Sequence, residues 1–164
     1  NSLFKNQKTA QQDSIKNFCK KISVIKKSRK SDDFFIVARI ESFILGQGLK
    51  DALKRANSYS KAGADAILIH SKENTPKQIF SFAKEFKKSK FFKPMIAVPS
   101  SYSKTYEKDL IKHGFSVVIY ANHLLRASYK IMKKTALEIL KYKRSFETEK
   151  DIVSVKDILM VKPE

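Results

Sequence analysis

The chain lacks cysteine pairs and long apolar runs. Its one cysteine, Cys19, excludes a disulfide within the chain, and a reducing compartment is the default for such a sequence, so we expect a cytoplasmic protein. No apolar run approaches the roughly 20 residues that span a bilayer, so we expect no membrane partner. The first residues, NSLFKNQKTAQQDS, contain no apolar signal-peptide core and begin with Asn rather than Met, which is compatible with a fragment or a processed chain.

Arginine is scarce in a strongly basic chain. The formal net charge is +18, but lysine supplies nearly all of the excess and lies on expected helix faces such as AKEFKKSKFFK. Proteins that read phosphates and bases favour the planar fork of arginine. We therefore interpret the lysines as a solvated surface that can steer anionic small molecules, and we expect no nucleic acid partner.

Several motifs of common enzyme classes are also missing. The GQG at 46–48 lacks the third glycine of a dinucleotide fingerprint, and the chain has no phosphate-binding P-loop and no CxxC. No group of His and Cys has the spacing of a zinc site. Ser71 follows His70 directly, but adjacent strand residues point to opposite faces, so the two do not form a catalytic triad.

What is present is an alternation of short β-branched runs with longer amphipathic ones. The hydrophobic fraction of 42% is enough for a sizeable core. Strands are expected at 34–40, 65–70, 94–100 and 115–123, and helices at 11–30, 46–63, 75–90, 103–114 and 123–141. Thr75 is the expected N-cap of its helix, the apolar side chains of 123–141 are expected to face inward, and the tail 151–164 suggests one more short helix.

Strands that alternate with helices indicate βαβ units and a parallel sheet. Four such units follow a first helix that has no strand before it. A complete (β/α)8 barrel needs roughly 250 residues. Two architectures therefore compete. One is a small open doubly wound sheet, and the other is the second half of a barrel, starting with the helix after its fourth strand.

Polar residues stand at the ends of successive expected strands. Arg39 and Glu41 end the first, in FFIVARIESF, and their shared parity places them on one face of an extended chain. His70 ends the second, and Asn122 lies at the end of the fourth. Parallel α/β folds place their sites at the carboxyl ends of strands, so together these residues favour an anion-binding site over a structural ion pair.

Three stretches carry a family resemblance. FFIVARIESFILGQGLKDALKRANSYSKAGADAILIHSK, VVIYANHLLRAS and DIVSVKDIL together resemble the phosphoenolpyruvate mutase branch of the isocitrate lyase superfamily. The likeness is collinear from residue 1 to about residue 159. It implies the second half of a (β/α)8 TIM barrel, about four parallel βα units with a C-terminal helical tail, in which residues 1–164 form the C-terminal part of a single barrel domain.

The resemblance also implies an activity and its residues. The activity is the interconversion of phosphoenolpyruvate and phosphonopyruvate, which forms a C–P bond in phosphonate biosynthesis. Arg39, His70, Asn1 and Ser2 would be catalytic and substrate-binding residues, with Asn1 and Ser2 at the close of the family's gating-loop motif. From their places at the strand ends, we expect Glu41 and Asn122 to orient these groups. The cofactor would be Mg²⁺, with ligands in the half that precedes this segment, so we expect the segment alone to be inactive.

The same resemblance implies a homodimer or homotetramer with exchanged C-terminal helices. It leaves two other reactions open on the same scaffold. One is hydrolysis of phosphonopyruvate, for which a Thr-Ser variant of the Asn-Ser motif is expected. The other is carbon–carbon cleavage of an oxaloacetate-like or citrate-like acid, which in this superfamily uses a loop cysteine that is not found here.

Overall fold

The computed structural model describes residues 11–161, so the predictions that concern residues 1–10 lie outside the described residues. The chain divides into two compact units, residues 1–120 and 121–164, and each is described by itself. The assignment of both units to one barrel domain stays a prediction. No helix of residues 11–161 is both long and apolar enough to cross a membrane.

The first unit alternates helices with strands in the expected order. Its helices are α1 (Ile15–Ser28), α2 (Gly48–Ala62), α3 (Lys77–Phe86) and α4 (Glu107–Lys112). Its strands are β1 (Val37–Ile40), β2 (Ala66–Ile69), β3 (Met95–Ala97) and β4 (Phe115–Val118). Each expected strand is present but shorter than predicted, because the flanking residues belong to the connecting loops.

The four strands form one parallel sheet in the sequential order β1-β2-β3-β4. A doubly wound sheet reverses its strand order at a switch point and carries helices on both faces. Here each strand lies next to its neighbour in sequence, as in a barrel. The order therefore confirms the half-barrel prediction over the open doubly wound sheet.

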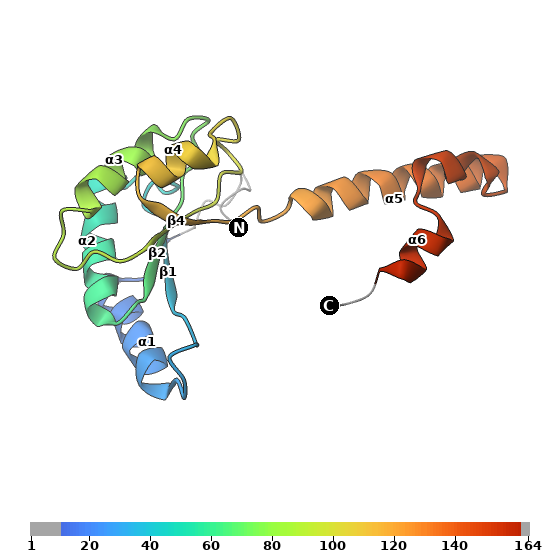
Figure 1. Cartoon of the computed structure of the whole chain (residues 1–164). Coiled ribbons are helices and arrows are strands. Elements are labelled where there is room, and N and C mark those ends of the chain that lie inside the picture. The colour runs from blue at the N-terminus through green and yellow to red at the C-terminus, as the bar shows by residue number, and fades with distance from the viewer. Residues whose placement is uncertain (1–10, 162–164) are drawn as a thin grey trace. The chain divides into compact units, whose positions relative to one another are not determined.

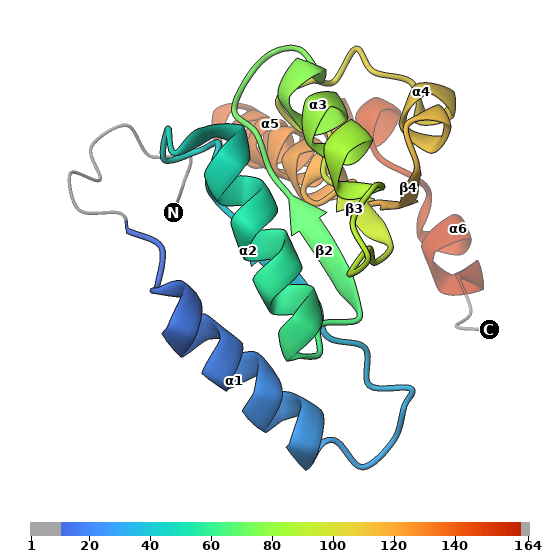
Figure 2. The ribbon, with the colours of Figure 1, turned by 90° about the vertical axis from the view of Figure 1, so that its left-hand side faces the viewer.

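The two faces of the sheet differ in what covers them. One face packs against side chains of α1–α4 in the main core, which includes Ile22, Ala56, Phe82 and Leu110 from the helices. Figures 1 and 2 show α2 and α3 on this same side of the strands. The other face holds a separate small cluster that consists of strand residues and one that follows β3: Ala66, Leu68, Ile96 and Val98. Helices on one face only are the arrangement of a barrel wall.

Local sequence explains where the helices begin and end. The Ser14 hydroxyl accepts the amide N–H of Asn17 at 3.1 Å and caps α1. Gly63 ends α2 with φ 114°, a left-handed conformation in which glycine avoids the steric cost of a Cβ. The expected Thr75 cap of α3 is wrong, because Pro76 holds the N-cap position and no side chain caps the helix.

The second unit is helical. It consists of α5 (His123–Tyr142), the 3-10 helix η1 (Phe146–Asp151) and α6 (Val155–Met160). Lys134 of α5 pairs with Asp151 of η1 at 2.6 Å, which ties the two helices together. The expectation that the apolar residues of α5 face inward is wrong here, because α5 has no buried residue and Leu124 is 86% exposed.

Asp65 joins three elements at the amino-terminal edge of the sheet. Its carboxylate accepts the Ile36 amide N–H at 3.0 Å and a guanidinium N–H of Arg29 at 2.9 Å, and Lys26 lies 3.6 Å away. Burial raises the pKa of Asp65, but the Ile36 amide and the two cations outweigh it and hold the pKa below its ordinary value. The ionised carboxylate therefore holds α1, β1 and β2 in place.

We predict that Asp65→Ala lowers the free energy of unfolding by about 2 kcal/mol, because the Ile36 amide and the Arg29 guanidinium lose a partly buried acceptor. The carboxylate contributes fully at pH values above its unfolded pKa of about 3.9, and the contribution fades as pH falls through the lower folded value. Urea unfolding at several pH values measures both effects.

Asp32→Ala is the matched control, because Asp32 also pairs with Arg29 but is 95% exposed. Its effect on the free energy of unfolding should stay within about 0.5 kcal/mol. Equal losses for the two variants would contradict the role assigned to Asp65.

Candidate functional site

Arg39 and Glu41 form an ion pair at the carboxyl end of β1. The Arg39 Nε–H donates to Glu41 Oε1, so the carboxylate fixes the plane of the guanidinium. Arg39 is level with Leu68 in the strand register, and Leu68 belongs to the face that the helices do not cover. The arginine side chain is 46% exposed there, so it remains accessible to a ligand.

His70 lies next to this pair because of the register between β1 and β2. Ile40 is level with Ile69, so Glu41 and His70 are each one residue past the last ladder pair. His70 is buried, with 5% of its surface exposed. Burial lowers the pKa of His70 below its ordinary value, the Arg39 charge lowers it further, and the Glu41 charge opposes both. The imidazole is therefore neutral near pH 7.

The loops behind these residues are held by their own hydrogen bonds. Ser71, fully buried, donates to Gln78 Oε1 at 2.6 Å and accepts the Glu73 amide at 3.1 Å, which fixes the turn directly after His70. The Ser71 hydroxyl therefore donates to Gln78 and not to His70. Directly after β1, the Glu41 amide donates to Gln12 Oε1 at 3.0 Å, a contact that the sequence pattern does not predict.

Two buried polar atoms of the cluster have no hydrogen-bond partner among residues 11–161. They are Glu41 Oε2 and His70 Nδ1. Buried polar atoms are normally satisfied, so atoms of this kind mark a place that a ligand or water completes. This face of the sheet therefore offers a guanidinium, a neutral imidazole and a carboxylate oxygen that can accept a hydrogen bond. Such a set suits a small anion that also carries a hydrogen-bond donor.

The cluster does not fit a metal ion. Its single carboxylate, Glu41, is engaged by Arg39, and Mg²⁺ takes several oxygen ligands. In the described range 11–161, no group of three or more His, Cys, Asp or Glu side chains has a metal-binding arrangement.

The structure does not place the three other predicted site residues relative to this cluster. Asn1 and Ser2 lie outside the described residues. Asn122 is the N-cap residue of α5 and belongs to the second unit, while Arg39 and His70 belong to the first. The roles of Asn1, Ser2 and Asn122 stay predictions.

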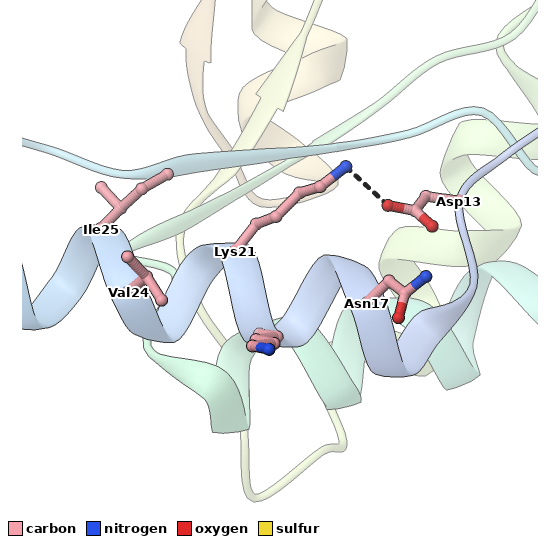
Figure 3. A pocket seen from close by; sticks show the side chains of 6 residues that line it. Asp13, Asn17, Lys21, Val24 and Ile25 are labelled. Atoms are coloured by element: carbon pink, nitrogen blue, oxygen red, sulfur yellow. Dashed lines mark hydrogen bonds and ion pairs between the residues drawn. The ribbon is translucent and has the colours of Figure 1, made fainter.

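A groove of about 560 Å³ lies elsewhere, along α1. It is lined by Asp13, Asn17, Lys20, Lys21, Val24 and Ile25. Figure 3 shows Lys21 reaching from the helix to Asp13, with which it pairs at 2.6 Å. No predicted site residue lines this groove, so the Arg39–Glu41–His70 cluster remains the candidate site.

We predict opposite shifts of the His70 pKa in two variants. Arg39→Gln removes the nearby cation and should raise the pKa of His70, and Glu41→Gln removes the nearby anion and should lower it. Titration of the imidazole signals by NMR measures both values.

A His70 curve that is unchanged in both variants would show that the three residues do not form one cluster.

The amino-acid sequence matches a known family over most of its length. The family model of phosphoenolpyruvate phosphomutase matches residues 3–140. A curated relative, the phosphoenolpyruvate phosphomutase of Tetrahymena pyriformis, is 39% identical over 150 residues. The match covers 92% of this chain and 49% of the relative, so the chain spans about half the length of that protein.

Solved structures give the same result. A phosphoenolpyruvate phosphomutase from Streptomyces platensis subsp. rosaceus superposes with a TM-score of 0.87 at 33% identity, covering 97% of this chain and 54% of that one. A phosphonopyruvate hydrolase in complex with oxalate and Mg²⁺ superposes with a TM-score of 0.84 at 32% identity, covering 95% and 54%. The family model, the curated relative and the folds agree, and the chain belongs to the phosphoenolpyruvate phosphomutase family.

Proposed function

We propose that this chain is part of an isomerase, a phosphoenolpyruvate phosphomutase that interconverts phosphoenolpyruvate and phosphonopyruvate. The observation that carries the proposal is the Arg39–Glu41 pair beside the buried neutral His70, at the carboxyl edge of a barrel-type sheet. The activity belongs to the longer polypeptide, because the relatives are about twice as long as this chain.

The cluster can bind and orient a phosphorylated carboxylic acid. Phosphoryl transfer depends mainly on positioning and on stabilising charge spread over the phosphoryl oxygens. Arg39 offers a guanidinium whose plane Glu41 fixes, so a substrate anion meets it with little loss of conformational freedom. The neutral His70 imidazole donates one N–H to an oxygen without adding a charge. Asn1 and Ser2 would guide the phosphoryl group and exclude water, as the sequence predicts.

Mg²⁺ is the proposed cofactor of the complete enzyme. A family relative, the phosphonopyruvate hydrolase, was solved with Mg²⁺ and oxalate. The Arg39–Glu41–His70 cluster does not fit the ion, so its ligands would come from residues outside this cluster and no step of the mechanism above passes through it.

Two other reactions remain as alternatives, and their products differ. The mutase converts phosphonopyruvate to phosphoenolpyruvate, whereas a hydrolase releases pyruvate and inorganic phosphate. A carbon–carbon lyase would cleave a citrate-like acid and leave phosphonopyruvate intact. Phosphorus NMR of the complete enzyme with phosphonopyruvate separates the three, and the mutase proposal fails if inorganic phosphate is the main product.

We predict that Arg39→Ala abolishes turnover in the complete enzyme, a loss of at least about 1000-fold, because the transferring group then loses the guanidinium that stabilises its charge. Arg39→Lys keeps the charge but loses the fork and should recover only part of the rate. Initial rates with phosphonopyruvate measure both variants.

Lys88→Ala is the charge-matched control, since Lys88 follows α3, is 65% exposed and pairs only with Glu85 in the described chain. It should keep the wild-type rate. Full turnover by Arg39→Ala would rule out the assignment of Arg39.

We also propose that the complete protein is a homodimer or homotetramer that exchanges its C-terminal helices. The supporting observation is the apolar surface of α5, which has no buried residue and exposes Leu124, Leu125, Tyr129, Met132 and Leu140. Exposed apolar surface of this extent is typical of an interface. A second copy of the chain would supply the matching surface.

We predict that Met132→Glu weakens this assembly, because Met132 is 67% exposed and an interface would have to bury the new charge. The mass in solution by light scattering should fall towards that of the monomer at micromolar protein. Lys130→Glu, on the same helix, keeps the apolar residues and should leave the mass unchanged. A monomeric wild type would contradict the proposal.

A further inference from the structure

The residues just before α1 are tied to the loop that follows β1. The Gln12 side chain makes three of these contacts: its Oε1 accepts the Glu41 amide N–H at 3.0 Å, and its Nε2 donates to Gln47 Oε1 at 2.6 Å and to Ser42 Oγ at 3.3 Å. Gln12 and Gln47 are 35 residues apart in sequence. One side chain therefore connects the segment before α1 with three residues of the loop that follows β1.

These contacts close into a ring. Ser42 donates to Asp51 Oδ2 at 2.7 Å, and Arg55 Nε donates to the same oxygen at 2.9 Å. A terminal N–H of Arg55 then donates to the backbone carbonyl of Asp13 at 2.9 Å. Ser42 and Arg55 are both buried. Because each member bonds two others, a shift of Gln12 or of the Glu41 backbone is resisted from both directions.

Glu41 needs such support because of its place in the chain. The ladder between β1 and β2 ends at Ile40 and Ile69, so the Glu41 amide lies beyond it. The Glu41 amide N–H instead donates to the side-chain amide oxygen of Gln12. The carboxylate of the same residue holds Arg39, so the position of the Glu41 backbone determines where the guanidinium sits.

We propose that Gln12 is a positioning residue for the candidate site: it fixes the Glu41 backbone, and through Glu41 it sets the guanidinium of Arg39 beside His70. Gln12 itself does not touch the reacting groups in this scheme. The placement of Glu41 by Gln12 follows from the hydrogen bonds alone, whereas the effect of Gln12 on catalysis rests on the proposed mutase function.

Three variants distinguish the effect of the Gln12 hydrogen bonds from the effect of its side-chain volume. Gln12→Met keeps a side chain of similar length but loses all three bonds. Gln12→Glu keeps an oxygen that accepts the Glu41 amide, and rotation of the Gln47 amide lets that residue donate to the new carboxylate. Gln11→Met is the matched control, because Gln11 is the exposed neighbour of Gln12 in the same segment.

The first measurement is the NMR titration of His70, which needs no enzyme activity. If Gln12 positions Glu41, Gln12→Met should lower the His70 pKa in the same direction as Glu41→Gln, and the double variant should add nothing to Glu41→Gln alone. Gln12→Glu should keep the His70 pKa closer to its wild-type value than Gln12→Met does, and Gln11→Met should leave it unchanged. Loss of thermal stability in Gln12→Met with an unchanged His70 titration would overturn the proposal.

The second measurement is steady-state turnover of the complete enzyme with phosphonopyruvate. Misplacement of Arg39 should reduce kcat/KM by about 10- to 100-fold in Gln12→Met, with the loss mainly in kcat and partial recovery in Gln12→Glu. Wild-type kcat/KM in Gln12→Met would overturn the catalytic consequence. If the wild type itself lacks mutase activity, the proposed function fails while the His70 titration still tests the positioning.

Discussion

The register of two parallel strands is the constraint on which the candidate site depends. Ile40 and Ile69 are level in the ladder between β1 and β2, so Glu41 and His70 follow as the next level pair. A slip of one residue would turn each side chain to the opposite face of its strand. The buried side chains of Ala38, Ile40, Ile67 and Ile69 prevent such a slip, because they would have to leave the helix-covered core. Side-chain packing on the helix-covered face of the sheet therefore determines which residues lie at the candidate site on the opposite face.

Burial determines the chemical state of that site. His70 lies between a cation and an anion whose effects on its pKa oppose one another, and desolvation is the largest influence. The imidazole is therefore neutral because it is buried, and Arg39 brings the only positive charge of the cluster. A substrate anion then meets one fixed cation and one neutral donor, so its charge is not shared between two competing cations.

Part of this could be predicted from residues close in sequence. The parity of Arg39 and Glu41 predicts a shared face, and their ion pair agrees with it. Gly63 and Ser14 mark helix ends through local backbone and capping chemistry, which sequence patterns report well. Thr75 shows the limit of the same rule, because Pro76 takes the cap position instead. The ring through Gln12 could not be predicted, since the bonds that Gln12 and the Asp13 carbonyl make to it join residues 29 to 42 positions apart and no periodicity encodes them.

The edges of the sheet explain why this unit fits a larger barrel. Within residues 11–161, β1 and β4 stand at the ends of the strand order, and each pairs with one strand. Free edges of parallel strands invite further pairing, and closure into a barrel removes them. The small cluster of Ala66, Leu68, Ile96 and Val98 lies on the face that a barrel encloses, and helices cover the other face alone. Additional strands beside β1 would complete this wall and would bring their own carboxyl ends to the edge where Arg39 and His70 stand. The edge of β1 would therefore allow further strands of a barrel to contribute residues to the same site.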